Sequence, residues 1–202
     1  MPIHTAVIRA FLGKWETSQT QAYIPHRRKN FTGHNDLAAC GDVIASSGVT
    51  IGTGLDLGQQ SEAELGRMGV PSGLIARFCP YLGLRREEAD FALERTPLTI
   101  TEAEREALDE AVHADYIRRA ANRFDRASEL AFEAVPAEAQ AVIVSLFYQL
   151  GDGAEKYPKT WALLCAGRLR DAAHELKTGF TKYANRRADE GRLLERIEGV
   201  RL

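Results

Sequence analysis

The stretch that decides the fold is Ser47-Gly48-Val49-Thr50-Ile51-Gly52-Thr53-Gly54-Leu55-Asp56-Leu57-Gly58-Gln59. In an extended chain its apolar residues share one face: Val49, Ile51, Leu55 and Leu57. Thr50 and Asp56 share the other face, but a straight strand would hold them about 20 Å apart at roughly 3.3 Å per residue. Gly52 and Gly54 permit a sharp bend that would bring Asp56 back towards Thr50. The pattern therefore predicts a bent β segment with a hydroxyl and a carboxylate on one face, and a purely structural turn is the alternative.

Upstream of this segment, residues 5–16 have helical periodicity. Their apolar side chains fall on one broad stripe: Val7, Ile8, Phe11, Leu12 and Trp15. We expect Glu16 at the C-terminal end of this helix, where the negative end of the helix dipole favours an uncharged side chain. A general acid must carry its proton near neutral pH, so Glu16 is a candidate proton donor. The alternative is a solvated glutamate at a frayed helix end.

The rest of the chain predicts an α+β fold. Residues 17–60 carry glycines and short β-type runs, which are typical of a small hairpin-based lobe. Residues 61–202 are mostly helical, with capping boxes opening at Ser61 and Thr101. Residues 139–150 are apolar almost all round, which predicts a buried central helix.

Composition and charge exclude several classes of function. A hydrophobic fraction of 45% with 27% charged residues is typical of a globular protein that needs no disulfides. The net charge of -2 provides no positive field for nucleic acid. No stretch approaches the roughly 18 apolar residues of a membrane span. The five histidines show no metal-binding spacing, so we expect neither a metal nor another cofactor.

The termini and cysteines bear on the compartment. The N-terminus lacks the apolar core of a signal peptide, so we expect synthesis in the cytoplasm without Sec export. Cys40, Cys79 and Cys165 are an odd number without metal spacing, which favours free thiols.

The chain resembles the phage-type lysozymes in three features: Glu16, the run Thr50-Ile51-Gly52-Thr53-Gly54 and the helical lobe. The fuller run to Gln59 is closer still to the lysozyme-like domain of pesticin, a bacteriocin. Further segments follow in the family's order: Ser145–Gly151, Trp161–Leu164, Gly167–Ala173 and Asn185–Arg187. The resemblance covers nearly the whole chain. It implies a single lysozyme-like domain over residues 1–202, with a small β-hairpin lobe and a larger, mostly helical lobe.

Within that domain, the resemblance implies an N-terminal helix over 1–16 and a β lobe over 17–60. The β lobe carries an insertion around residues 27–42, because the gap from Glu16 to Thr50 is longer than the family leads us to expect. The helical lobe would span 61–202.

The resemblance also implies roles for individual residues. Glu16 matches the catalytic acid, and Thr50 matches the threonine that helps to place the attacking water. Asp56 matches the second carboxylate in the pesticin-like order. Arg186 or Arg187 resembles an arginine that pairs with the catalytic glutamate, and Tyr23 completes the expected set as a substrate-binding or acid-pairing residue.

The chain also departs from the phage-type pattern at the second carboxylate. In those enzymes the aspartate precedes the threonine by a few residues, and here that position is Ile44. Asp42 is the nearest substitute, so the second carboxylate is either Asp56 or Asp42.

The resemblance leads us to expect a muramidase that cuts the β-1,4 bond between N-acetylmuramic acid and N-acetylglucosamine. An inverting mechanism would place the two carboxyl groups about 6.5–9.5 Å apart. Peptidoglycan strands are the expected partner of a monomeric enzyme, which would reach the cell wall through a holin or specialised export. An immunity or inhibitor protein is a further possible partner. The alternatives are a chitinase- or chitosanase-like glycosidase and a non-catalytic module that binds glycan or protein.

Overall fold

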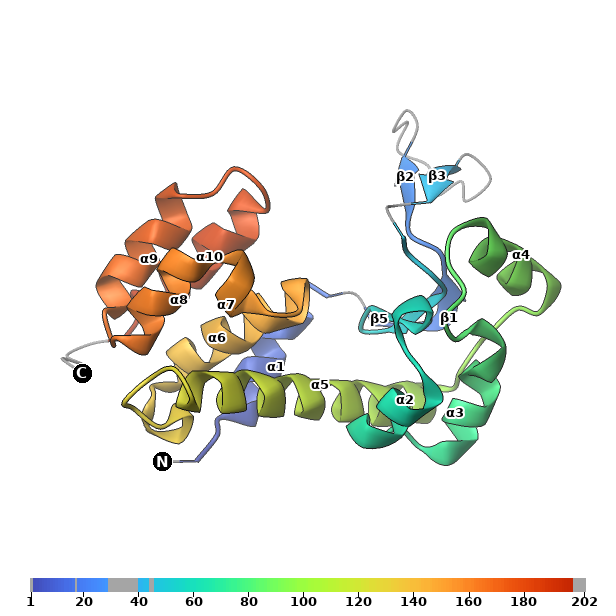
Figure 1. Cartoon of the computed structure of the whole chain (residues 1–202), viewed down its shortest axis with the longest axis horizontal. Helices are drawn as coiled ribbons and strands as arrows, with labels where there is room; N and C mark the ends of the chain where they lie inside the picture. The colour runs from blue at the N-terminus through green and yellow to red at the C-terminus, as the bar shows by residue number, and fades with distance from the viewer. Residues whose placement is uncertain (1, 17, 29–39, 44–45, 198–202) are drawn as a thin grey trace. The chain divides into compact units, whose positions relative to one another are not determined.

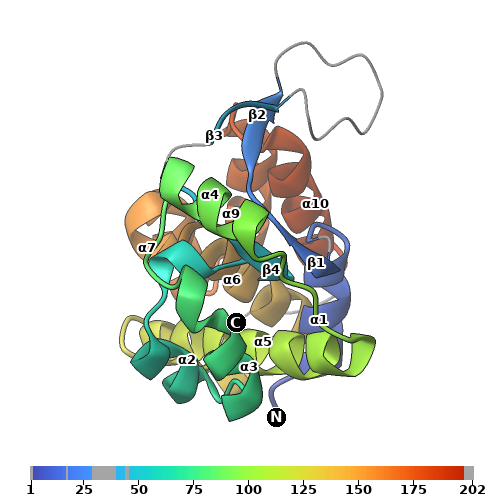
Figure 2. The same ribbon diagram turned by 90° about the vertical axis from the view of Figure 1, so that its right-hand side faces the viewer.

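The computed structural model describes residues 2–16, 18–28, 40–43 and 46–197. The chain divides into two compact units, one of Met1–Trp15 with Asp115–Leu202 and the other of Glu16–Ala114. This division differs from the expected boundary near residue 60, because the second unit also contains helices up to residue 114. Most elements of each unit are labelled in Figure 1, and β4 is labelled in Figure 2.

The Glu16–Ala114 unit is built on a three-stranded antiparallel sheet. Its strands are β1 (Gln19–Tyr23), β4 (Thr50–Gly52) and β5 (Leu55–Asp56), in the order β1-β4-β5. Figure 2 shows β1 beside β4. A second hairpin joins β2 (His26–Arg28) to β3 (Cys40–Val43). These two strands flank the expected insertion, of which residues 29–39 lie outside the described part of the chain.

The deciding segment forms a tight hairpin, as the sequence predicts. β4 ends at Gly52 and β5 begins at Leu55, so Thr53 and Gly54 alone separate the two strands. Gly52 has a φ of 61° and Gly54 a φ of 91°, which is a backbone conformation that glycine adopts without strain. The bend predicted from these two glycines is therefore confirmed.

Helices complete this unit. They are α2 (Glu62–Met68), α3 (Ser72–Phe78), α4 (Glu87–Arg95) and the first part of α5 (Glu102–Asp125). The short 3-10 turn η2 (Leu57–Gln59) follows β5 directly. Both predicted capping boxes are present, since Ser61 exchanges hydrogen bonds with Glu64 and Thr101 does so with Glu104.

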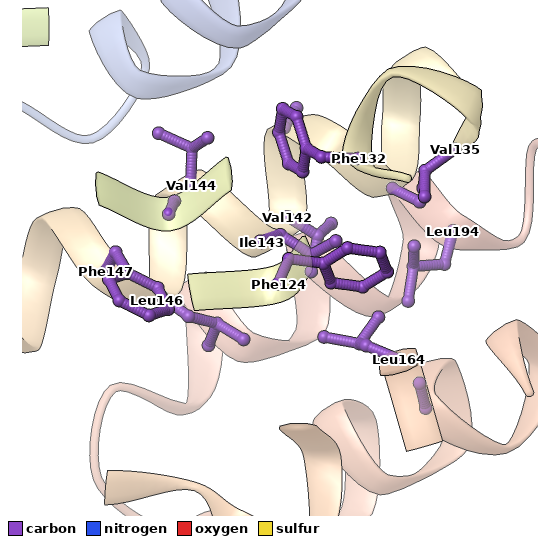
Figure 3. Close-up of a cluster of buried hydrophobic side chains, with 14 of the residues drawn as sticks. Phe124, Phe132, Val135, Val142, Ile143, Val144, Leu146, Phe147, Leu164 and Leu194 are labelled. Carbon is purple, nitrogen blue, oxygen red and sulfur yellow. The ribbon is translucent and has the colours of Figure 1, made fainter. Parts of the chain in front are cut away.

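The other unit is helical. It contains α1 (Thr5–Gly13), α6 (Ala137–Leu150), α7 (Gly153–Lys156), α8 (Pro158–Cys165), α9 (Leu169–Thr178), α10 (Ala184–Leu194) and the last part of α5. As predicted, α6 is the buried central helix, because apolar side chains on all its sides meet neighbouring helices. Figure 3 shows this core, in which Phe124 of α5 and Leu164 of α8 accompany the α6 residues Ile143 and Leu146.

The N-terminal helix is shorter than the sequence predicts. It ends at Gly13, because the N–H groups of Lys14 and Trp15 bond to carbonyls only three residues back, at Phe11 and Leu12. Glu16 therefore lies beyond the helix end.

In the described part of the chain, no helix has the length and apolar character needed to cross a membrane. Cys79 is exposed and Cys165 is half-buried, and both are free thiols.

Candidate active site

Three of the predicted site residues form a row across the sheet. Tyr23 of β1 pairs with Thr50 of β4, and Thr50 pairs in turn with Asp56 of β5. Directly opposed residues of antiparallel strands project from the same face, with Cβ atoms about 4.5–5.5 Å apart. The hairpin therefore aligns a phenol, a hydroxyl and a carboxylate on one face of the sheet.

Backbone hydrogen bonds hold the Asp56 carboxylate. Its Oδ1 accepts the N–H of Gly48 at 3.0 Å and the N–H of Gly58 at 2.9 Å, and the second of these caps η2. Burial raises the pKa of Asp56, while these two bonds, Arg85 and Gln59 act in the opposite direction. Both of these backbone bonds end on Oδ1.

Close backbone packing holds Gly48 and Gly58, whose N–H groups donate to Asp56. A Cβ on Gly48 would lie 2.4 Å from the carbonyl oxygen of Leu84, and one on Gly58 would lie 2.3 Å from it. Both positions therefore require glycine. Arg85, next in the chain, donates to the Gly58 carbonyl at 3.0 Å and to the Gln59 side chain at 3.0 Å.

Glu16 lies at the turn of the same hairpin. A Cβ built on Gly54 would be 3.9 Å from Glu16 Oε2. Burial raises the pKa of the Tyr23 hydroxyl, and the negative charges of Glu16 and then Asp56 raise it further. The structure therefore brings both carboxylates within electrostatic reach of one phenol.

Thr50 is almost fully buried, and its hydroxyl donates to the Gly48 carbonyl at 3.3 Å. This long bond leaves the lone pairs of the oxygen as acceptors. Thr50 lies in the middle of the row, between Tyr23 and Asp56.

Asp42, the alternative second carboxylate, belongs to a different sheet. It lies on β3, which pairs with β2 in the register His26–Val43 and Arg28–Cys40. Thr50, by contrast, has Asp56 as its direct cross-strand neighbour. The backbone pairing thus favours Asp56.

Arg186 and Arg187 belong to a buried polar cluster in the other unit. Arg187 donates to Glu190 Oε1 at 2.6 Å and to Gln149 at 2.8 Å, and Arg186 donates to the Ser145 hydroxyl. Ser145 in turn donates to Glu190. The sequence reading did not single out Glu190, although its i,i+3 spacing from Arg187 is a helical ion-pair signal. The pairing of Arg186 or Arg187 with Glu16 stays a prediction.

Sequence reasoning also missed Asp109 of α5, which contacts the β4–β5 hairpin. It accepts the N–H of Thr53 at 2.9 Å and the hydroxyl of Ser18 at 2.5 Å. In the sequence, Asp109 stands out only as an acidic residue directly after an apolar one on an amphipathic helix. That pattern is too common to indicate a site.

The site holds groups for acid–base chemistry. Within the described residues, no three His, Cys, Asp or Glu side chains gather closely enough to hold a metal ion. The row holds the Asp56 carboxylate beside two hydroxyl groups, with the Glu16 carboxylate at the hairpin turn, and such groups can move protons.

Comparison with known families identifies the family of this chain. A family model described as "Pesticin: Bacterial toxin homologue of phage lysozyme, C-term" matches residues 8–170. The chain belongs to the pesticin family. Its fold is accordingly lysozyme-like, and membership of the pesticin family supports a lysozyme-type peptidoglycan hydrolase at the level of the family. No curated protein matches the chain.

Proposed function

We propose that this protein is a muramidase, which hydrolyses the β-1,4 bond between N-acetylmuramic acid and N-acetylglucosamine in peptidoglycan. The single observation that carries the proposal is the row Tyr23–Thr50–Asp56, with Glu16 at the turn of the same hairpin. A pair of carboxyl groups is what most glycosidases use for hydrolysis, and a hydroxyl beside one of them can bind the attacking water.

In the proposed reaction Glu16 is the general acid. Its carboxyl group protonates the bridging oxygen as the bond to N-acetylmuramic acid breaks, so that the N-acetylglucosamine side leaves as a neutral alcohol. The positive charge that develops on the muramic ring is spread over the anomeric carbon and the ring oxygen. Water then adds to the anomeric carbon.

Asp56 is the proposed general base. Its Oδ2 takes a proton from the water, while the Thr50 hydroxyl accepts a hydrogen bond that orients the same water. Because the water adds from the face opposite the leaving group, the configuration inverts. Tyr23, whose phenol is influenced by the charges of both carboxylates, pairs with the acid or binds the substrate.

The biological setting proposed is lysis of bacterial cell wall after holin release or specialised export. Peptidoglycan is then the partner, and the enzyme acts as a monomer. A cognate immunity or inhibitor protein would protect the producing cell.

The test is digestion of purified peptidoglycan by the wild type and by Glu16→Gln, with mass spectrometry of the soluble products. Glu88→Gln is the matched control, since Glu88 is an exposed glutamate on α4 in the same unit. We expect the wild type and the control to release muropeptides ending in reducing N-acetylmuramic acid, and Glu16→Gln to release none. Full activity of Glu16→Gln would rule out Glu16 as the general acid. Cleavage of chitin or chitosan but not of peptidoglycan would show that the substrate is not peptidoglycan.

A further inference from the structure

Asp109 has an unusual set of partners for a helix residue. It lies on α5 with 8% of its surface exposed. Its Oδ1 accepts the N–H of Thr53, and its Oδ2 accepts both the Ser18 hydroxyl and Nη1 of Arg105, the last at 2.8 Å. Arg105 also donates to the Ser18 oxygen at 3.0 Å. One buried carboxylate thus receives three donors, and two of them come from outside its own helix.

Those two outside donors belong to the segments that carry the proposed catalytic groups. Ser18 lies two residues after Glu16, and Thr53 lies in the turn between Thr50 and Asp56. Asp109 therefore joins the backbone that carries the acid to the hairpin that carries the base. Both links run to the same side chain on a long helix, so the distance between the segments is fixed by one rigid element.

The hairpin turn is shaped to admit Asp109. A Cβ at Gly52 would lie 2.8 Å from Asp109 Oδ1 and 3.0 Å from Leu108, so only glycine allows this approach. The next glycine, Gly54, is the one beside Glu16 Oε2. The turn thus contacts Asp109 on one side and the proposed acid on the other.

We propose that Asp109 is a positioning residue, which sets the spacing between Glu16 and the Thr50–Asp56 pair through Ser18 and Thr53. The inference rests on the proposed function. A general acid and a base act on one bond only when both are held at the correct separation, and a displacement of about 1 Å can cost roughly 100-fold in rate. Asp109 is buried, and in this inference it acts only through Ser18 and Thr53.

The test compares Asp109→Asn with Asp115→Asn. Asp115 is the matched control, because it is a second buried carboxylate on α5 that bonds to arginines, namely Arg118 and Arg119. Asparagine at position 109 keeps one acceptor but turns an NH₂ group towards donors. With soluble labelled peptidoglycan fragments as substrate, we expect kcat to fall by about 10- to 100-fold in Asp109→Asn with KM within twofold of wild type. Asp115→Asn should keep the wild-type kcat.

A second pair of variants tests the same inference if Asp109→Asn fails to fold. Ser18→Ala removes one donor and should lower kcat by about fivefold, whereas Ser18→Thr keeps the hydroxyl in an extended segment and should restore it. Thermal unfolding of each variant is followed by circular dichroism.

The outcomes separate this inference from the proposed function. Wild-type kcat in both Ser18→Ala and Asp109→Asn overturns the positioning role, as does an equal loss of kcat in Asp115→Asn. If Glu16→Gln retains full activity, the proposed function fails. If Glu16→Gln is inactive while Ser18→Ala and Asp109→Asn turn over normally, the positioning inference alone fails.

Discussion

Thr50 and Asp56 are six residues apart in the chain and lie directly opposite each other on β4 and β5. The turn at Gly52 and Gly54 brings about this pairing, and the backbone N–H groups of Gly48 and Gly58 hold the carboxylate that results. In the proposed mechanism the pair binds and activates one water. Its chemical and structural roles can be separated by mutation.

Asp56→Asn should lower activity by about 10²- to 10⁴-fold, because the amide cannot take a proton from water. Its stability should fall by less than about 1 kcal/mol, since the amide oxygen still accepts the N–H of Gly48 and of Gly58. Asp56→Ala should cost about 1–2 kcal/mol more through loss of the cap. Urea unfolding and turbidity loss of peptidoglycan measure the two effects.

Asp152→Asn is the control for this pair, because Asp152 also caps a helix by accepting a backbone N–H, that of Ala154 at 2.9 Å. It should keep full activity. An Asp56→Asn variant as active as the wild type would exclude Asp56 as the base and would leave Asp42 as the candidate.

The charge of Arg85 should affect the pH at which activity is lost on acidification, which is the acid limb of the pH–rate profile. Burial raises the pKa of Asp56, and the positive charge of Arg85 opposes that rise. Removing the charge in Arg85→Gln therefore raises the pKa further. The base works only when ionised, so activity should be lost at a higher pH on acidification in Arg85→Gln than in the wild type.

The control is Arg86→Gln, an exposed neighbour of Arg85. Profiles of kcat/KM between pH 3 and 7 should coincide for this variant and the wild type. An acid limb that moves downward in Arg85→Gln, or not at all, would contradict the assignment of that limb to Asp56.

Gly58→Ala should inactivate the enzyme and destabilise it by about 2–4 kcal/mol, because the added Cβ would meet the Leu84 carbonyl oxygen at 2.3 Å. Gly66→Ala on α2 is the matched control. Nothing lies within 4 Å of a Cβ there, so alanine should stabilise this helix by about 0.5–1 kcal/mol. Equal melting temperatures for the two variants would refute the packing argument.

Tyr23→Phe tests the phenol at the end of the row. The ring remains, and only the hydroxyl, whose pKa the charges of Glu16 and Asp56 raise, is lost. We expect kcat to fall by about tenfold with little change in stability. A changed KM at constant kcat would instead assign Tyr23 to substrate binding.

The local features of the fold could be predicted from sequence. The capping boxes, the buried α6 helix and the glycine bend each depend on residues close together in the chain, so their signals are local. The exact end of α1 could not be predicted, because it depends on the switch to tighter hydrogen bonds at Lys14 and Trp15.

The part of the candidate site that lies on the β4–β5 hairpin could be predicted from sequence. Thr50 and Asp56 share a parity that the bend preserves, whereas the row with Tyr23 depends on the register between β1 and β4. Asp109 lies 56 residues from its partner Thr53, and no periodic pattern connects them. The Glu190 cluster likewise depends on the packing of α6 against α10.

The most direct test of the central claim is the configuration of the first product. Proton NMR follows the anomeric signal during rapid digestion of soluble peptidoglycan fragments by the wild-type enzyme, before mutarotation. With Glu16 as acid and Asp56 as base, reducing N-acetylmuramic acid should appear first as the α-anomer. The β-anomer appearing first, or reducing N-acetylglucosamine in its place, would contradict the account.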